Sequence, residues 1–462
     1  MPLANELLQA ISRPGGGAVG LILGAGCSVE PPTNIPVARR VSEEIHHSLV
    51  NDGVLQDGNC KNPADLSLLT DEVFARSEPH SQQAVVERLL ARYDLKAATA
   101  NDGYLIAAAL LCEGAVSSVV TLNFDLALTN AVAQLGANSV VGIIESPNDL
   151  PTQKVLNVYY LHRNANADPE CWILRTAALK TEWKDQWEPI IAARILTAPV
   201  IVFAGLGTPI AVLLESSRLI RNALPKTSIY QVDPANIGDS EFFQESGLDP
   251  SRYIQLGWGD FMDQLSQRLV AEHIHQLDQA MRTKIQEGLQ PEEFDNFLQQ
   301  LRPLGLLKQG KLRSDWLIDK RPYLPVSADV TGLVADLCLA VTMMMRVSGT
   351  SVRFVEDGIL EFQRDGRIVA SYIIASGRGH RRTAAVEADV SNRRHLYKRH
   401  QRKPNGIILG GTSDGVGVAS TPPADITFGD VSTDNVVDQI GLPIYHITEL
   451  RAEPHILREL LP

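Results

Sequence analysis

The stretch LILGAGCSV, from Leu21 to Val29, decides the fold of the N-terminal half of this chain. Its apolar residues run into two glycines and a serine, the pattern of a buried strand that ends in a tight turn before a helix. Such a turn brings backbone N–H groups close to whatever lies in front of it, and phosphate groups bind well there. The third glycine of the common dinucleotide-binding pattern is absent, so the stretch by itself also fits a purely structural turn.

Strands and helices alternate along the chain from about residue 18 to residue 270. The expected strands are uniformly apolar, which is typical of a parallel sheet covered by helices on both faces. We therefore predict an α/β domain with a Rossmann-like parallel sheet, in which ligands bind beyond the carboxyl ends of the strands. The expected strands are 18–23, 116–122, 157–161, 199–205 and 227–233, and examples of the expected helices are 36–50, 82–93 and 209–223.

The composition is that of an ordinary globular protein. The 462 residues are 44% apolar and 21% charged, and this length is enough for two to four domains. No long uncharged apolar run and no secretory signal pattern is present, so we expect a cytoplasmic protein without a membrane contact. The five cysteines are scattered and form no CxxC pair, which argues against structural zinc and against disulfides.

The C-terminal part predicts a second α/β unit. We expect a first domain at 1–272, a helical connector at 273–324, and a regulatory or assembly domain at 325–462. The last domain shows a long helix, three strands joined by EDG and RDG turns, a basic helix, an apolar strand and a final strand. This order resembles a restriction-endonuclease-like core, but the third strand lacks the E-x-K motif, so a degenerate core without nuclease activity is expected.

The glycine-rich run GIILGGTSDGVG, residues 406–417, leaves three interpretations open. It resembles the turns of nucleotide-sensing domains, and it also fits a surface loop. In the third interpretation the unit takes no ligand and only packs against another protein or another copy of this chain.

Polar or glycine residues follow four of the expected strands, at their carboxyl ends. Asp125 taken alone fits a helix N-cap, and a lone His162 fits a structural histidine. Asn123 is harder to explain as structure, because nothing evident at that strand end needs an amide. The four stretches are GAGCS (Gly24, Ala25, Gly26, Cys27, Ser28), TLNFD (Thr121, Asn123, Asp125), YYLHRN (His162) and FAGLGTPI (Gly205, Gly207, Thr208).

Together and in this order, the four stretches resemble the motifs of the sirtuin superfamily, over roughly residues 15–272. The loop NIPVAR (34–39) and the later segments YQVDP and LGWGDFMDQL match further parts of the family pattern. The resemblance implies that NAD+ binds as substrate, with its pyrophosphate on the first glycine turn. It implies Asn123, His162 and Asp125 as catalytic residues, and contacts to NAD+ from Gly24, Ala25, Gly26, Ser28, Arg39, Thr121, Gly205, Gly207, Thr208, Asp233 and Asp260.

The chain also departs from the family pattern. The four-cysteine zinc ribbon is missing, since only Cys171 lies between residues 163 and 202, and Arg163 and Ala38 stand where the family has glycine and phenylalanine. No metal is therefore expected. In the family the acyl-lysine cleft lies between the zinc module and the sheet, so the resemblance does not extend to a site for peptide deacylation. In this reduced plan the chain resembles bacterial sirtuin-like NAD+ hydrolases of antiphage defence.

We therefore expect an NAD+ glycohydrolase. Asn123 would hold a water or an amide at the ribose, His162 with a pKa near neutrality would act as general base, and Asp125 would fix the loop. Two alternatives remain: an NAD-dependent deacylase or ADP-ribosyltransferase acting on protein, and a catalytically inactive nucleotide-binding subunit.

A basic segment stands out in an acidic chain. The net charge is −12, but residues 364–403 hold eleven Lys and Arg against three Asp and Glu, a local charge of +8 that leaves −20 elsewhere. We expect this segment to contact protein rather than nucleic acid, because only Tyr397 lies beside it for base stacking. A homo-oligomer is expected, or a defence partner such as a ring-forming ATPase or a short Argonaute. The basic residues are Arg393, Arg394, Lys398, Arg399, Arg402 and Lys403.

Overall fold

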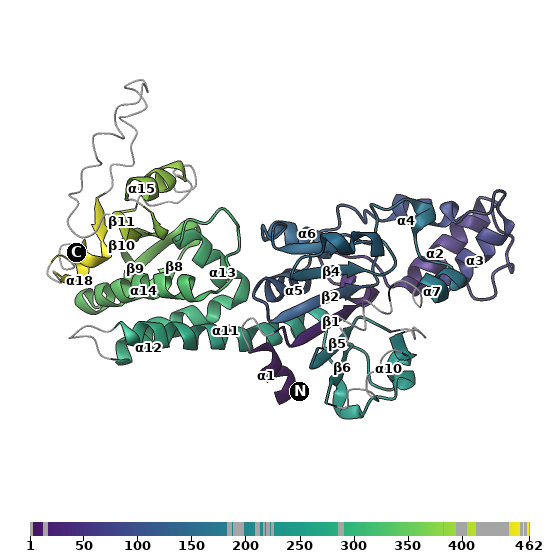
Figure 1. Ribbon diagram of the computed structural model, residues 1–462, viewed down its shortest axis with the longest axis horizontal. Helices are drawn as coiled ribbons and strands as arrows, with labels where there is room; N and C mark the ends of the chain where they lie inside the picture. Colours follow the sequence, from purple (N-terminus) through teal and green to yellow (C-terminus); the bar gives the residue numbers. More distant parts are fainter. Residues whose placement is uncertain are drawn as a thin grey trace, which may run out of the picture. The chain divides into compact units, whose positions relative to one another are not determined.

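The computed structural model divides the chain into two compact units, Met1–Leu269 and Val270–Pro462, and each contains its own sheet (Figure 1). The residues that the structure describes are 3–12, 17–182, 187, 198–207, 213–215, 218, 222, 226–284, 291–381, 383–393, 404–412, 443–452, 456 and 460–461.

The first unit is built on a seven-stranded sheet in which every strand runs parallel to its neighbours. The strand order is β3-β4-β2-β1-β5-β6-β7, so β1 lies between β2 on one side and β5 on the other. This arrangement confirms the predicted parallel α/β fold. The strands are β1 (Val19–Leu23), β2 (Val116–Thr121), β3 (Val141–Ile144), β4 (Leu156–Tyr160), β5 (Val200–Ala204), β6 (Ser228–Val232) and β7 (Tyr253–Ile254).

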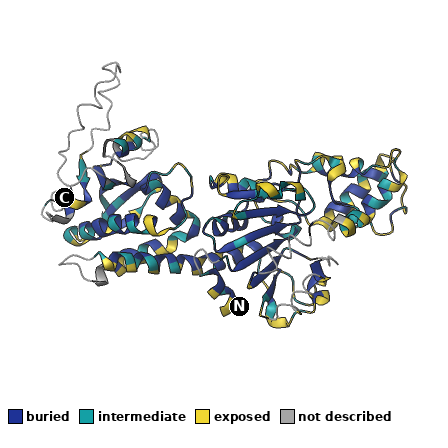
Figure 2. Ribbon diagram, in the orientation of Figure 1, coloured by how far each residue is buried: buried dark blue, intermediate teal, exposed yellow. Residues whose placement is uncertain are grey.

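The middle of this sheet is buried on both faces. Every residue of β1 and of β5 is buried (Figure 2). Side chains such as Ile22, Val120, Tyr159 and Phe203 join four neighbouring strands in one apolar core. Strands buried on both faces need apolar side chains at every position, which is why they were visible in the sequence. The strands that the sequence did not reveal, β3 and β7, are short and lie at the two edges.

Nine helices with described ends accompany this sheet, and α5 is the most apolar of them. It packs against α6 and β2, and eight of its eleven residues are buried. The helices are α1 (Asn5–Ile11), α2 (Ala38–Asn51), α3 (Leu66–Arg76), α4 (Gln83–Arg92), α5 (Asp102–Cys112), α6 (Ala127–Gln134), α7 (Thr176–Glu182), α10 (Glu241–Ser246) and α11 (Trp258–Thr283), the last of which continues into the second unit.

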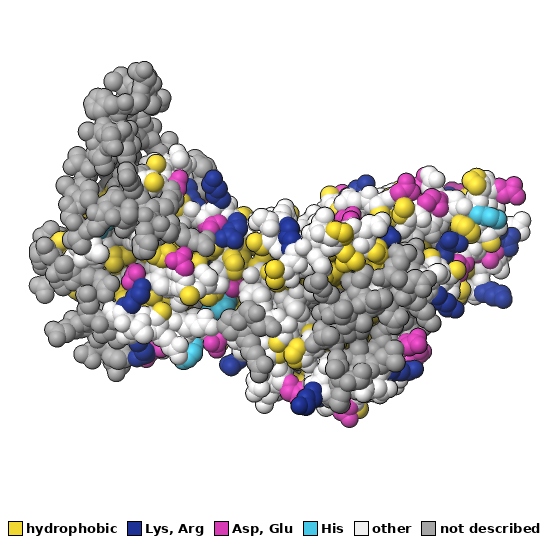
Figure 3. Space-filling model, in the orientation of Figure 1, with side chains coloured by type: hydrophobic (Ala, Val, Ile, Leu, Met, Phe, Trp, Pro, Cys, Tyr) yellow, Lys and Arg dark blue, Asp and Glu magenta, His cyan; other side chains and the backbone are white. Residues whose placement is uncertain are grey.

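Helices α2, α3 and α4 pack together and carry charged side chains of both signs on their surface (Figure 3). Glu44 of α2 pairs with Arg40 at 3.0 Å and with Arg92 of α4 at 2.5 Å. The arginines of these pairs are more than half exposed, and exposed pairs contribute little to stability. These pairs therefore contribute little to the packing of the three helices.

The second unit contains a five-stranded mixed sheet in the order β12-β11-β10-β9-β8. Strands β8, β9 and β10 are antiparallel, while β10, β11 and β12 are parallel, as the expected α/β unit requires. Asp365 and Gly366 both have positive φ between β9 and β10, which matches the predicted two-residue hairpin turn. The strands are β8 (Ser351–Phe354), β9 (Ile359–Arg364), β10 (Arg367–Arg381), β11 (Gly406–Thr412) and β12 (Ile444–His446).

The helices α12 and α13 pack against α14 within the second unit. Helix α14 is long and apolar enough to cross a membrane by length and composition, but 67% of its most apolar window is buried, and it packs against β10, β11 and α18. It is thus the core helix of this unit. The helices are α12 (Pro291–Leu301), α13 (Gly305–Trp316), α14 (Ala328–Ser348), α15 (Thr383–Asn392) and α18 (Ile447–Ala452).

Part of the predicted basic helix is described. Its first half forms α15, and Arg393 directly follows. The guanidinium of Arg393 donates hydrogen bonds to the backbone oxygens of Asp315 at 3.3 Å and Asp319 at 2.9 Å. Arg393 therefore helps to hold the end of α13 inside its own unit. The other predicted basic residues, 394–403, lie outside the described residues, as do residues 413–417 of the glycine-rich run.

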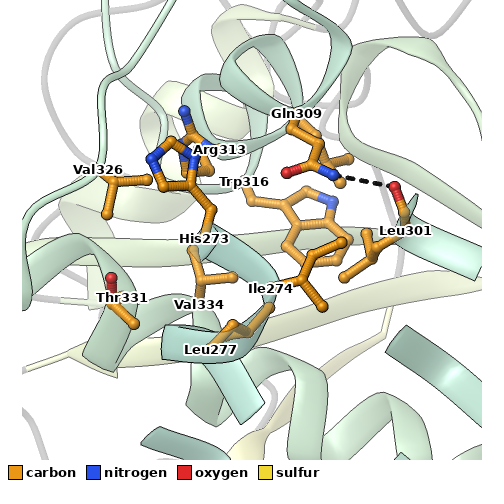
Figure 4. Close-up of a pocket in the computed structure, with 11 residues that line it drawn as sticks. His273, Ile274, Leu277, Leu301, Gln309, Arg313, Trp316, Val326, Thr331 and Val334 are labelled. Carbon is orange, nitrogen blue, oxygen red and sulfur yellow. Dashed lines mark hydrogen bonds between the residues drawn. The ribbon is translucent and has the colours of Figure 1, made fainter. Parts of the chain in front are cut away.

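A small cavity lies in the second unit between α11, α13 and α14 (Figure 4). Its volume is about 40 Å³, and its walls are mainly apolar, with His273, Gln309, Arg313 and Thr331 among the polar residues. A space of this size holds a few water molecules at most. It is too small for a nucleotide.

Candidate functional site

The order of the strands in the first unit creates a switch point at β1. The chain passes from β1 to β2 on one side, and β5 lies on the other side. In open parallel sheets, the crevice at such a point, beyond the carboxyl ends of the strands, is where ligands bind. The predicted stretches GAGCS, TLNFD and FAGLG follow β1, β2 and β5, so the fold brings all three to this crevice.

The two glycine turns pack directly against each other. The N–H of Gly26 donates to the carbonyl of Gly205 at 2.9 Å, and Gly205 has a φ of +67°, which favours glycine. A Cβ added at Gly26 would lie 2.7 Å from the Cα of Gly205, and one at Gly24 would lie 2.6 Å from the Gly205 oxygen. The space beside Gly24 and Gly26 is therefore filled by the second turn, so these glycines are needed for the contact between the turns.

Gly207 differs from the other glycines of the site. A Cβ added there would meet no described atom within 4 Å, and the residue is exposed. The Gly207 carbonyl accepts a hydrogen bond from the N–H of Phe242 at 3.2 Å. Unlike Gly24 and Gly26, Gly207 therefore has no described neighbour that requires a glycine. Ala25 is partly buried in the short 3-10 helix Ala25–Ser28. Thr208 lies outside the described residues.

Asn123 is the centre of a buried hydrogen-bond network at the end of β2. Its Nδ2 donates to the Gly24 carbonyl at 3.1 Å, to Ser28 Oγ at 3.0 Å and to the Tyr104 hydroxyl at 2.9 Å. The backbone N–H of Asn123 donates to Oγ1 of Thr121 at 3.1 Å. The network thereby ties the ends of β1 and β2 to α5.

Asp125 extends this network and holds the start of α6. Ser28 Oγ donates to its Oδ2 at 2.8 Å, and the N–H of Ala127 donates to its Oδ1 at 3.0 Å. Burial raises the pKa of the Asp125 carboxyl, although these hydrogen bonds oppose the shift. The N-cap residue of α6 is Leu126, so Asp125 lies one residue before the cap position, and its carboxylate fixes the loop and the first N–H of the helix.

One atom of the network has no partner among the described residues. The Oδ1 of Asn123 is buried and accepts no hydrogen bond from them, while the Nδ2 of the same amide is surrounded by acceptors. A buried polar atom without a partner costs about 1–3 kcal/mol, so such atoms point to a ligand or a water. Asn123 Oδ1 is therefore an acceptor that a water or another hydrogen-bond donor can use.

His162 follows β4, the neighbour of β2, and lies beside the same loop. Its ring is 5.8 Å from the ring of Phe124, and Phe124 stacks on Trp172 at 4.6 Å. Burial lowers the pKa of His162 to about 4, because the charged form loses its hydration. This differs from the expected pKa near neutrality, and it leaves the imidazole neutral at pH 7.

Arg163, which stands where the resembling family has glycine, keeps a glycine-like backbone. Its φ is +69°, and its Nη1 donates to the Glu145 carbonyl at 3.0 Å. A non-glycine residue in this conformation stores strain, which is common at functional sites. The turn after His162 therefore retains the shape that a glycine would give it.

The remaining predicted residues lie around the crevice rather than in the network. Asp233 is buried at the end of β6, where it accepts from the N–H of Ala235 at 2.9 Å. Arg39 of α2 is exposed and pairs with Glu241 at 3.3 Å. Asp260 is exposed in the first turn of α11. Within the described part of the chain, no hydrogen bond or ion pair joins any of the three to Asn123.

Sequence reasoning missed Tyr104 and Asn101. Asn101 caps α5 by accepting from the N–H of Tyr104 at 3.0 Å, and its Nδ2 donates to the Cys27 carbonyl at 2.8 Å. An Asn before an apolar helix is a capping signal that could have marked Asn101. Nothing in the sequence marks Tyr104, because a tyrosine in an apolar helix normally reads as core. In the described part of the chain, no group of three His, Cys, Asp or Glu could hold a metal ion.

Comparisons with known proteins give distant structural similarity and no sequence match. No family model and no curated protein matches the chain. A mutant Sir2 homologue in complex with ADP-ribose is similar at 15% identity and a TM-score of 0.35, covering 62% of this chain and 100% of that one. A Sir2 homologue in complex with NAD is similar at 16% identity and a TM-score of 0.35, covering 57% and 92% of the two chains.

Proposed function

We propose that the first unit binds NAD+ and cleaves its nicotinamide–ribose bond with water. The products are nicotinamide, ADP-ribose and a proton. The observation that carries this proposal is the buried network at the switch point, which offers the unpartnered Oδ1 of Asn123 next to the loop that His162 contacts. The ordered motifs that resemble the sirtuin superfamily support the same substrate.

The geometry fits a dinucleotide at three points. Gly207 is exposed, and no atom of the described residues lies within 4 Å of the position of its missing Cβ, which leaves room for a pyrophosphate among these residues. Asn123 offers an acceptor for a hydroxyl of the ribose or for a water. Asp233 at the end of β6 lies farther along the same edge, where the resemblance implies the adenosine half.

The chemistry needs orientation of the ribose and a group that takes a proton. Cleavage develops positive charge at the ribose carbon, and water must then attack that carbon. Asn123 orients the donor that it binds, while the neutral imidazole of His162 has an acceptor nitrogen for the proton of a hydroxyl or of the water. Asp125 holds Ser28 and the start of α6 in place.

We extend the proposal to the role in the cell on the strength of the resemblance alone. The chain would be a cytoplasmic effector of bacterial antiphage defence, kept inactive until its C-terminal part or a partner reports infection. The part at 325–462 would serve regulation or assembly, through a homo-oligomer or a partner such as a ring-forming ATPase or a short Argonaute. A constantly active NAD+ hydrolase would deplete its own host, so an inactive state is required.

The test is nicotinamide release from NAD+ by the purified full-length chain, alone and with candidate activators. We expect release by the wild type and its loss in Asn123→Ala. Parallel assays with an acylated peptide and with labelled NAD+ on protein measure deacylation and ADP-ribosyl transfer. If protein becomes ADP-ribosylated and no free ADP-ribose is formed, the chain is a transferase and not a hydrolase. Tight NAD+ binding without any cleavage would assign the inactive-subunit alternative.

A further inference from the structure

Tyr104 occupies a defined place in the network around Asn123. Ser28 has one hydroxyl hydrogen, and it is directed to Oδ2 of Asp125 at 2.8 Å. The contact of 2.7 Å between the Ser28 and Tyr104 hydroxyls must then use the hydrogen of Tyr104. The Tyr104 oxygen in turn accepts from Nδ2 of Asn123 at 2.9 Å. The Tyr104 hydroxyl thus donates to Ser28, and the Ser28 hydroxyl donates to Asp125.

This direction fixes the amide of Asn123. Its Nδ2 faces three acceptors: the Gly24 carbonyl, Ser28 Oγ and the Tyr104 oxygen. Rotating the amide by 180° would place Oδ1 against the Gly24 carbonyl, so that two acceptors would face each other. The observed orientation therefore leaves Oδ1 as the atom presented to a ligand.

The tyrosine itself is held rigidly. It lies in the first turn of α5, is 1% exposed, and its ring meets the Trp258 ring edge-on at 6.1 Å. A Cβ on the neighbouring Gly103 would lie 2.2 Å from Trp258 Nε1, so α5 and α11 are in close contact here. Burial also raises the pKa of Tyr104 well above its usual range. The hydroxyl therefore keeps its proton near pH 7 and can donate a hydrogen bond.

We propose that Tyr104 is a positioning residue, which acts through Ser28 and Asn123 to keep Oδ1 of Asn123 directed at the substrate. The inference rests on the proposed NAD+ cleavage at this site and adds to it the group that orients the amide. Tyr104 touches no substrate atom in this assignment. Its contribution passes entirely through the Asn123 amide.

The decisive variant is Tyr104→Phe, which keeps the packed ring and removes only the hydroxyl. We expect kcat for nicotinamide release to fall about 10-fold, because the amide loses its bond to the Tyr104 oxygen and Ser28 loses the bond that Tyr104 donates to it, while KM for NAD+ stays within about 3-fold. In an Asn123→Ala background the same change should have no further effect, since nothing remains to be oriented. An equal additional loss in that background overturns the proposal.

A matched control is Tyr160→Phe. The Tyr160 hydroxyl is also buried and is bonded to Thr129 Oγ1 at 2.9 Å, but it takes no part in the network. Both variants lose one buried hydroxyl, so both should lower the unfolding temperature by a similar amount, and only Tyr104→Phe should lower kcat. If the two variants lose the same fraction of kcat, Tyr104 is only structural.

A second measurement does not depend on catalysis. In full-length protein with ¹⁵N-labelled asparagine, the side-chain amide signal that disappears in Asn123→Ala reports this amide directly. We expect its hydrogens to exchange with solvent at least about 10-fold faster in Tyr104→Phe than in wild type or Tyr160→Phe. Unchanged exchange overturns the positioning role. If exchange is faster in Tyr104→Phe but the wild-type protein cleaves no NAD+, the positioning role is retained and the proposed reaction is rejected.

Discussion

Gly26→Ala and Gly207→Ala form a pair that separates two reasons for a glycine in this site. A Cβ at Gly26 would lie 2.7 Å from the Cα of Gly205 and 3.0 Å from its oxygen, whereas a Cβ at Gly207 would meet no atom of the described residues within 4 Å. Carbon atoms normally approach to about 3.5–4.0 Å, so the methyl group at Gly26 overlaps its neighbour by about 0.8 Å or more. The neighbour is backbone that follows the central strand β5, and it has little freedom to move.

The magnitude follows from this overlap. Overpacking a buried position costs about 1–3 kcal/mol, and for a unit of this size each kcal/mol lowers the unfolding temperature by about 2–4 °C. We expect Gly26→Ala to lower it by about 2–12 °C. The methyl group at Gly207 would contact none of the described residues, so its effect on the free energy of unfolding should be within about 0.5 kcal/mol. It should instead weaken NAD+ binding, because it occupies the space proposed for the pyrophosphate.

Scanning calorimetry of the full chain measures the first effect, and titration calorimetry with NAD+ measures the second. The reasoning is refuted if Gly26→Ala unfolds at the wild-type temperature. It is also refuted if Gly207→Ala lowers the unfolding temperature as much as Gly26→Ala does. Unchanged NAD+ affinity in Gly207→Ala would remove Gly207 from the proposed binding site.

Three further predictions concern catalysis and control. Asn123→Ala and His162→Ala should each lower kcat for nicotinamide release at least about 10²-fold while circular dichroism shows a folded chain, and near-normal rates would remove them from the mechanism. Because burial lowers the pKa of His162 to about 4, the imidazole is protonated, and unable to accept a proton, only below that pH. The acid limb of kcat/KM should therefore have its midpoint near pH 4, and a midpoint near 6.5 would contradict the assignment. Changing Arg394, Lys398 and Arg402 to Glu should disrupt assembly in a salt-sensitive way, measured by light scattering, whereas an unchanged particle mass would leave this segment as a solvated surface.

The sequence predicted the middle of the first sheet better than its edges. Strands β1, β2, β4, β5 and β6 were expected within a residue or two, because strands buried on both faces must be apolar throughout. Strands β3 and β7 were not expected, since they have four and two residues and make their hydrogen bonds on one side only. Whether such a short segment becomes an edge strand depends on its hydrogen bonds to the neighbouring strand, and its amino-acid composition does not reveal those bonds.

In the second unit, the same contrast appears between local turns and long-range contacts. The RDG turn was predicted because Asp365 and Gly366 tolerate the positive φ that the hairpin needs. The role of Arg393 was not predicted, because its bonds to Asp315 and Asp319 join residues more than 70 positions apart. Its charge alone suggested an outward contact.

The sequence by itself determined which strand ends carry polar residues, and parallel strands bring such ends to one edge. That was enough to place Asn123, Asp125 and the glycine turns together. Only the tertiary structure decided that Gly26 packs on Gly205, that Tyr104 from α5 enters the network, and that burial keeps His162 neutral. Periodicity and local propensity reflect neighbours along the chain, whereas Cβ clearance, hydrogen-bond direction and desolvation depend on atoms that the fold brings from elsewhere.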